Sequence, residues 1–199
     1  MKVNFDREME KIISQLKENR IKPKLLLHAC CAPCASSCIE RLKEFFEITL
    51  YFYNPNMDSE KEYFLRAEEI KKLAERFSVD YIIEEYEQDV FYSAVTGLEQ
   101  EKEGGARCDK CFNLRLTKTA KKAKQLKADY FATTLTVSPL KNANLINKIG
   151  VDIGKEQGVE YLLSDFKKKN GYIRSIEISK ELNLYRQNYC GCKFSKGEV

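Results

Sequence analysis

The chain has 199 residues, of which 43% are hydrophobic and 32% are charged, with 34 lysines and arginines against 30 aspartates and glutamates. A chain of this length buries roughly 70% of the surface that its unfolded form exposes, so its core needs no disulfide bonds. No segment approaches the roughly 20 consecutive apolar residues of a membrane-spanning helix. The net charge of +4 is too small to indicate a nucleic-acid partner by itself.

Helical and strand-like hydrophobic patterns alternate along the whole chain. Asn54-Pro55-Asn56 ends one predicted strand, and Gly158 follows one predicted helix. The expected elements are, in chain order, helix 5–20, strand 24–29, helix 33–46, strand 48–53, helix 59–77, strand 79–83, a weak helix 86–96, helix 107–127, strand 130–134, helix 142–157 and a short strand 161–163.

Strands that alternate with helices of ten or more residues favour right-handed crossovers and a parallel sheet covered on both faces. We therefore expect an α/β fold, a Rossmann-like three-layer sandwich with a mostly parallel sheet of about five strands. No repeat, low-complexity tract or long linker divides the sequence. Residues 1–199 are expected to form one domain.

The eight cysteines are numerous for a chain without a need for structural disulfides. Charged residues alternate through residues 1–20, without the basic start and apolar stretch of a secretory signal, so we expect a cytoplasmic protein. In that reducing compartment, clustered cysteines favour metal binding or redox catalysis over structural bridges.

Seven of the cysteines fall into three groups. The first group follows the first predicted strand, where α/β sheets bind ligands, and the second has the spacing of one helical face. The third surrounds a glycine that permits a tight backbone turn. The groups, which could converge on one site, are Cys30, Cys31 and Cys34; Cys108 and Cys111; and Cys190 and Cys192. Cys38, one helical turn beyond Cys34, is expected to be a small buried apolar residue.

Two interpretations of these groups remain open. Cys31 and Cys34 with Cys108 and Cys111 offer four soft ligands in two Cys-x-x-Cys pairs, as in a structural zinc site. That interpretation leaves the other thiols without a role. An iron-sulfur cluster held by four thiolates, with separate redox thiols beside it, would use the whole set.

Nucleotide binding at the first strand is not expected. Residues 29–37 contain no glycine, so a Gly-rich phosphate loop for ATP or a dinucleotide is absent there. Two basic segments, 118–127 and 167–174, could contact an RNA backbone or could be solvated surfaces. Aromatic residues near the cysteines could stack on a base, although core packing is the commoner role; they are Tyr51, Tyr53 and Phe112.

Five segments together resemble the epoxyqueuosine reductases of the QueH type, which complete queuosine biosynthesis in tRNA. The segments are LLLHACCAPCASSC, YFYNPNM with the following EYFLRAEEIKKLA, RCDKCFNLRL, FATTLTVSPLKN and YRQNYCGCKFS. The order of Cys-Cys-x-x-Cys, Cys-x-x-Cys and Cys-Gly-Cys makes the match specific, and it spans the whole chain. Leu140 departs from the family pattern, in which a polar or aromatic residue is frequent at this position.

The resemblance implies reduction of the epoxide of epoxyqueuosine to the cyclopentene of queuosine, at the wobble base of tRNAs with a GUN anticodon. It also implies a [4Fe-4S] cluster with a neighbouring iron ion, an electron donor that the sequence does not identify, and no cobalamin. The cluster ligands implied by the resemblance are Cys30, Cys31, Cys108 and Cys111.

Roles for other residues follow from the same resemblance. Cys190 and Cys192 would be a redox-active pair, and Cys34 and Asp109 would hold the second metal. Cleavage of an epoxide needs a proton donor, for which Tyr53, Asp109 and His28 are candidates, although a histidine at a strand end is more often structural.

Two alternative functions belong to other classes. A cluster-dependent tRNA sulfurtransferase shares this sheet type, but the glycine-free turn argues against its use of ATP. A zinc-stabilised RNA-binding module is the alternative without catalysis, and the identity of the metal separates it from both enzymes.

Overall fold

The computed structural model describes residues 3–196 of the chain. Residues 1–2 and 197–199 of the predicted single domain lie outside the described residues. The helices and strands, in chain order, are α1 (Phe5–Asn19), β1 (Lys24–His28), α2 (Ala32–Leu42), β2 (Glu47–Phe52), α3 (Glu60–Phe77), β3 (Asp80–Ile83), α4 (Gln88–Ala94), α5 (Ala106–Gln125), β4 (Tyr130–Thr133), the 3₁₀ helix η1 (Thr134–Val137), α6 (Ala143–Gln157), β5 (Glu160–Tyr161), α7 (Gly171–Glu181) and the 3₁₀ helix η2 (Lys193–Ser195).

The five strands form one parallel sheet in the order β3-β2-β1-β4-β5. The strand β1 is central, and its last residue His28 pairs with Tyr51 of β2 and with Thr133 of β4. The chain moves outward from β1 to one edge and then returns to pair β4 on the other side. This reversal of direction creates a switch point at the carboxyl ends of β1 and β4, where open α/β sheets bind their ligands.

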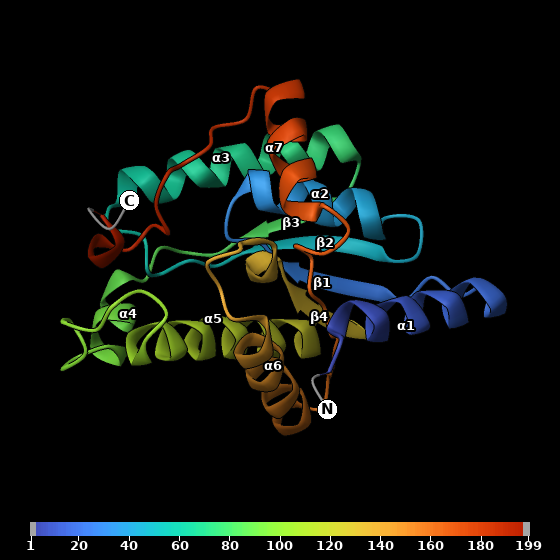
Figure 1. The fold of residues 1–199 in the computed structure, drawn as a ribbon, viewed down its shortest axis with the longest axis horizontal. Coiled ribbons are helices and arrows are strands. Elements are labelled where there is room, and N and C mark those ends of the chain that lie inside the picture. The colour runs from blue at the N-terminus through green and yellow to red at the C-terminus, as the bar shows by residue number, and fades with distance from the viewer. Residues whose placement is uncertain (1–2, 197–199) are drawn as a thin grey trace.

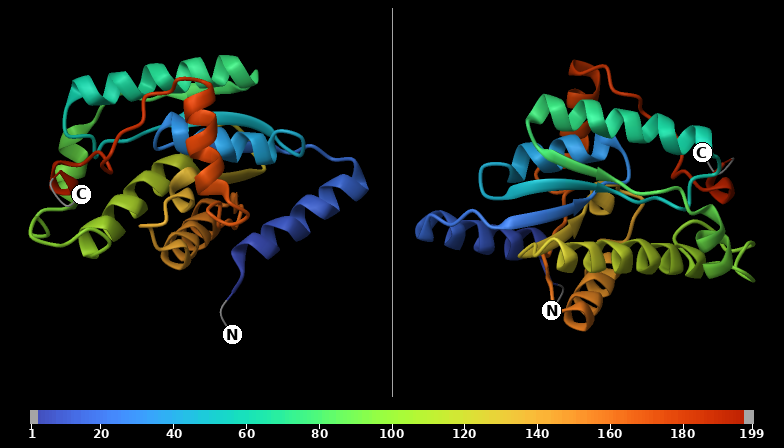
Figure 2. Two further views of the ribbon diagram at one scale, coloured as in Figure 1. Left: turned by 45° about the horizontal axis from the view of Figure 1, so that its top comes forward. Right: turned by 180° about the vertical axis from the view of Figure 1, so that it is seen from behind.

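Helices cover both faces of the sheet (Figure 1). The helices α2, α3 and α7 lie on one face, and α5 and α6 lie on the other, as the turned views also show (Figure 2). Alternate side chains of β1 enter the two cores, because Leu25 and Leu27 pack on the α2 side and Leu26 packs on the α5 side. The three-layer α/β sandwich with a parallel five-stranded sheet is therefore confirmed.

Local sequence signals explain several helix boundaries. Asn4, Ser59 and Asn142 accept backbone N–H hydrogen bonds at the starts of α1, α3 and α6. Pro33 occupies the first turn of α2, where a missing N–H costs nothing. Gly158 ends α6 with a left-handed backbone conformation, φ +73°.

The sequence-based elements differ from the structure in a few places. The helix expected over 33–46 ends at Leu42, and the short strand expected over 161–163 is Glu160–Tyr161. The sequence does not predict the helix α7, because its buried positions Ser175, Ile178 and Ser179 include only one large apolar side chain. No helix of the described chain is both long and apolar enough to cross a membrane.

Candidate active site

The first cysteine group follows β1 directly. The Sγ atoms of Cys30, Cys31 and Cys34 all lie within 4.8 Å of one another, and the Sγ atoms of Cys30 and Cys31 are 3.8 Å apart. Cys31 precedes α2 and Cys34 lies in its first turn, so the turn from strand to helix brings the three thiols together. The Oγ1 atom of Thr134, which follows β4, lies 3.4 Å from the Sγ of Cys30. The thiols therefore occupy the switch point of the sheet.

The three thiols differ in pKa. Hydrogen bonds from Cys31 and Cys34 hold the pKa of Cys30 well below its usual range, and the positive charge of Arg115 acts in the same direction. The same interaction with Cys30 raises the pKa of Cys31 to about 12, and it also raises the pKa of Cys34. One negative charge is thus favoured, and a bound cation would be needed to hold three thiolates so close together.

The second and third cysteine groups line one pocket. Cys108 and Cys111 lie in the first turns of α5, and Cys190 and Cys192 come from the C-terminal segment on the other side of the same pocket. Burial raises the pKa of Cys111 to about 12, whereas the nearby guanidinium of Arg115 lowers it only in part. The N–H of Gly104 donates to the Sγ of Cys108 over 3.2 Å.

The C-terminal Cys190-Gly191-Cys192 turn is fixed to the loop between β2 and α3. The N–H of Asp58 donates to the carbonyl of Gly191 over 2.8 Å, and Tyr189 donates from its hydroxyl to Asp58. The buried Arg66 donates to the carbonyl of Cys190 over 3.3 Å and stays close enough to Cys31 for their charges to interact. The turn is thus fixed to the segment after β2 and shares Arg66 with the first cysteine group.

A fully buried arginine connects the two parts of the site. Arg115 of α5 donates to the Nε2 of His28 over 3.4 Å and to the side-chain oxygen of Asn54, and its Nη1 lies 3.9 Å from the Sγ of Cys111. Asn54 in turn donates to the carbonyl of Ala29, which precedes the first thiol. The guanidinium therefore ties α5 to the end of β1 and places positive charge among the thiols.

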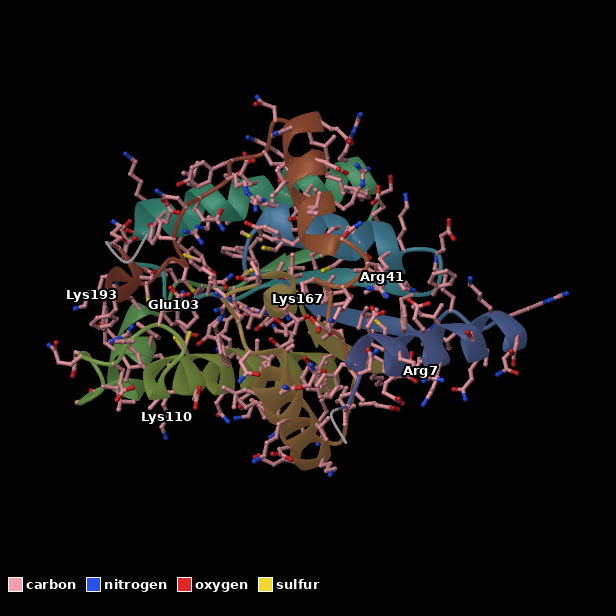
Figure 3. The ribbon with its side chains drawn as sticks, in the orientation of Figure 1. Arg7, Arg41, Glu103, Lys110, Lys167 and Lys193 are labelled. Carbon is pink, nitrogen blue, oxygen red and sulfur yellow. The ribbon has the colours of Figure 1, made fainter. Side chains whose placement is uncertain are left out.

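Two polar residues that sequence reasoning missed also line the pocket, Asn56 and Lys141. Burial alone would lower the pKa of Lys141, but negative charge on Cys190, Cys30 and Glu103 raises it, so the side chain stays an ammonium. Its Nζ lies 3.7 Å from an oxygen of Glu103. Figure 3 shows Glu103 near the C-terminal segment that carries Lys193. An isolated lysine in a loop carries no periodic signal, and only the fold reveals its position.

The other predicted site residues differ in their burial and in whether they line this pocket. Tyr53 and Tyr51 are buried in the core under α5 and do not line the pocket. Asp109 of α5 is half-buried, next to Cys108 in the chain, and is not among the residues that line the pocket. Cys38 is completely buried in the opposite core, as expected. Leu140, 73% exposed, borders the pocket mouth.

His28 is enclosed within the fold. Its ring is fully buried, and its nitrogens lie 2.8 Å from the Oγ1 of Thr133 and 3.2 Å from the carbonyl oxygen of Tyr53. Burial, and then the charge of Arg115, lowers the pKa of His28 to about 3, so the ring is neutral at physiological pH. Phe112 lies in the same core as Tyr53 and also borders the pocket.

Several cations of the two basic segments are paired within the molecule. Lys118 pairs with Glu87 and Lys122 with Glu84, at 3.0 and 2.6 Å. In the other segment, the cations Lys167, Lys169 and Arg174 pair with Asp165, Glu10 and Glu40. These pairs support the interpretation of both segments as solvated surfaces.

The fold and the site together define a class of protein, an α/β sandwich with a thiol-rich pocket at the carboxyl edge of its parallel sheet. A family model described as Epoxyqueuosine reductase QueH matches residues 25–198. The chain belongs to this family.

Relatives with the same description are similar over most of their length. A Streptococcus pyogenes protein is 42% identical over 98% of this chain and 78% of its own length. A Staphylococcus epidermidis protein is 45% identical over 98% of this chain and 85% of its own. A Thermotoga maritima protein is 37% identical over 86% of this chain and 89% of its own.

Two solved structures share the fold at low sequence identity. A U34-tRNA thiolase of Methanococcus maripaludis, NcsA, described with its [4Fe-4S] cluster, is similar with a TM-score of 0.57 at 13% identity, covering 96% of this chain and 68% of its own. An NMN synthetase of Francisella tularensis has a TM-score of 0.52 at 12% identity, covering 97% and 76%. These likenesses support the sandwich fold alone.

Proposed function

We propose that this protein reduces epoxyqueuosine to queuosine at the wobble base of tRNAs with a GUN anticodon, as the name of its family indicates. The observation that carries the proposal is a group of three thiols at the switch point of the sheet, a pocket lined by the other four clustered thiols, and a buried Arg115 whose charge interacts with Cys111, Cys30 and Cys190. Redox thiols at a ligand-binding edge suit an oxidoreductase whose substrate enters from the same side.

The reaction consumes two electrons and two protons. Both C–O bonds of the epoxide break, a C=C bond forms between the two carbons, and the oxygen leaves as water. Negative charge develops on the oxygen when the first C–O bond breaks, so the site must stabilise an alkoxide and supply protons.

The thiols suit an iron-sulfur cofactor. Three Sγ atoms within 4.8 Å of one another carry charge that a metal would compensate, and thiolates are the ligands that hold such clusters. In our proposal a [4Fe-4S] cluster is held by Cys30, Cys31, Cys108 and Cys111, and an adjacent iron ion by Cys34 and Asp109. When bound, the cluster supplies single electrons and the iron ion supplies Lewis acidity.

The remaining pair, Cys190 and Cys192, is proposed to cycle between dithiol and disulfide. No disulfide joins the eight cysteines within residues 3–196. The anchored Cys190-Gly191-Cys192 turn favours this role, because contacts with Asp58 and Arg66 hold the pair at the pocket. Asp109 and Tyr53 are kept as proposed proton donors, and Asp109→Asn and Tyr53→Phe test them individually.

The proposed partners are the modified tRNA and an electron donor that remains to be identified. The turn after β1 lacks glycine, which favours a reaction without ATP. Because tRNA modification takes place there, the proposed location is the cytoplasm.

The test is an assay for queuosine formation by anaerobically purified protein. Epoxyqueuosine-containing tRNA and a one-electron reductant are added, and nucleosides are measured by mass spectrometry after digestion. We expect queuosine to appear only with the protein, and without ATP. Unchanged epoxyqueuosine in every condition would contradict the proposal, and a thiolated tRNA formed with ATP would favour the sulfurtransferase alternative.

A further inference from the structure

The thiol pocket contains polar groups that the proposed cluster and redox pair leave unused. Asn56, from the segment after β2, and Lys141, from the segment after η1, both border this pocket together with Cys108, Cys111 and Cys190. They come from the two loops that flank β1 in the sheet, on the ligand-binding edge. Both residues therefore line the pocket at the ligand-binding edge of the sheet.

The side chain of Asn56 is only 1% exposed, and neither its oxygen nor its nitrogen has a hydrogen-bond partner within residues 3–196. Buried amide groups are almost always hydrogen-bonded, because an unpaired one forfeits its hydration. A primary amide that faces a pocket with both atoms free is suited to a ligand that offers an acceptor and a donor.

Lys141 is the second unused group. Its side chain is 11% exposed, and its ammonium pairs with Glu103 at 3.7 Å, which is beyond hydrogen-bond distance. The pocket's other cation, Arg107, is held in place through its Nη1, which donates to the carbonyls of Leu98, Glu99 and Glu101, although its Nε has no hydrogen-bond partner within residues 3–196. Of the two cations that line the described pocket, Lys141 is thus the one whose charged group makes no hydrogen bond within residues 3–196.

We propose that Lys141 and Asn56 contact the substrate directly: the Lys141 ammonium donates a hydrogen bond to the epoxide oxygen as its first C–O bond breaks, and the Asn56 amide orients the same ring. This assignment rests on the proposed function. Lys141 forms no covalent bond and carries no electron; both electrons come from the donor of the overall reduction, and the two protons come ultimately from solvent.

The chemistry of the pocket suits this role. An ammonium in a largely buried pocket stabilises developing negative charge more strongly than the same group in water, because less water screens it. The neighbouring thiol sulfurs and Glu103 keep Lys141 charged, and Glu103 holds it loosely enough to let a ligand take its place. Asn56 contributes to binding before and after bond cleavage alike, so the two residues should affect different kinetic constants.

The experiment compares anaerobically reconstituted wild type with Lys141→Met, Lys141→Arg, Asn56→Ala and Asn56→Asp. Lys155→Met, an exposed residue of α6, is the control for loss of one positive charge. Iron content, visible spectrum and tRNA affinity are measured beside kcat and KM. These readouts separate a contact with the substrate from a structural role.

We expect Lys141→Met to lower kcat by about 10²–10³-fold, as loss of an oxyanion donor does, with iron content, spectrum and tRNA affinity unchanged. Lys141→Arg should retain part of the activity, and Lys155→Met all of it. Asn56→Ala and Asn56→Asp should raise KM by about tenfold with a smaller change in kcat.

The assignment would be overturned by a Lys141→Met variant with wild-type kcat, or by one whose activity falls only in proportion to its iron content. Wild-type KM in both Asn56 variants would likewise exclude that residue. A wild type that does not reduce the substrate would instead contradict the proposed function. The two failures are therefore distinguishable.

Discussion

Arg115 is a fully buried cation whose partners are themselves buried. His28 and Asn54 accept from its guanidinium, and Cys111 lies within reach of its Nη1. A charge in the interior is tolerated only when its hydrogen bonds are satisfied, and this one also brings positive charge to thiols that must become thiolates. The residue therefore stabilises the fold and, in the proposed cluster-bound state, would also favour thiolates.

Replacement of Arg115 by Met should destabilise the folded protein. The variant leaves Nε2 of His28 and the side-chain oxygen of Asn54 without a donor, which should lower the free energy of unfolding by about 2–4 kcal/mol. Denaturant unfolding of the metal-free protein measures this cost. Arg76→Met, an exposed arginine of α3, is the matched control, and an equal loss in both variants would contradict the account.

The Cys190 and Cys192 thiols should be required for turnover and dispensable for the cluster. Replacing either by Ser should abolish reduction of the epoxide, because a single thiol cannot close an internal disulfide. Iron and sulfide per chain should stay at the wild-type level, as measured by colorimetric analysis after anaerobic reconstitution. Retained activity would remove the pair from the mechanism, and lost iron would make it a ligand pair.

Among individual residues, the sequence allowed prediction of the candidate site residues that belong to an uncommon residue type. Seven cysteines at a strand end, on one helical face and around a glycine could be recognised from type and spacing. Asn56, Lys141 and Arg115 could not, because asparagine, lysine and arginine are common surface residues. Their burial depends on which loops the sheet brings together.

At the scale of elements, the C-terminal segment matters because its turn carries Cys190 and Cys192 to the pocket. Gly191 has φ +118°, and a Cβ atom there would lie 2.6 Å from the Sδ of Met57, which is fully buried. Position 191 therefore requires glycine for two reasons: its positive φ disfavours other residues, and Met57 leaves no room for a Cβ atom. Gly158 offers a matched comparison, because its φ is +73° and a Cβ atom there would meet no other atom within 4 Å.

Gly191→Ala should displace the turn and lower activity by at least about tenfold, because the displaced thiols no longer meet the substrate. Gly158→Ala should cost about 1 kcal/mol of stability from its left-handed backbone and leave specific activity unchanged. Thermal unfolding and the queuosine assay measure both effects. Equal activity in the two variants would show that the turn needs no close approach to Met57.

Helices with a broad apolar face could be predicted from the sequence, whereas α7 could not. The helix α7 packs against α2, and the positions that the two helices bury include the small residues Ser175 and Ser179 of α7 and Ala35 and Ser36 of α2. Close helix packing through small residues removes the hydrophobic period on which prediction depends. The basic stretch at its start, 167–174, is also typical of a solvated loop.

For the whole molecule, topology brings cysteines that are distant in sequence to the Cys30 end of β1 and to the pocket that the second and third cysteine groups line. The order of strands puts β1 between β2 and β4, so the loops after these strands surround the Cys30 end of β1. Alternation of strands and helices predicted the parallel sandwich and its ligand-binding edge. The pattern did not predict which thiols lie closest to one another. The turn from β1 to α2 determines this, because it brings Cys34 close to Cys30 and Cys31.

The metal content of the anaerobically purified protein tests the central claim most directly. Iron, zinc and acid-labile sulfide are counted per chain, and the visible spectrum is recorded before and after dithionite. The account predicts about four iron and four sulfide with a band that bleaches on reduction, and about one further iron if the adjacent ion is bound. One zinc without sulfide, in a colourless protein, would contradict a cluster-dependent reductase and leave a structural zinc site.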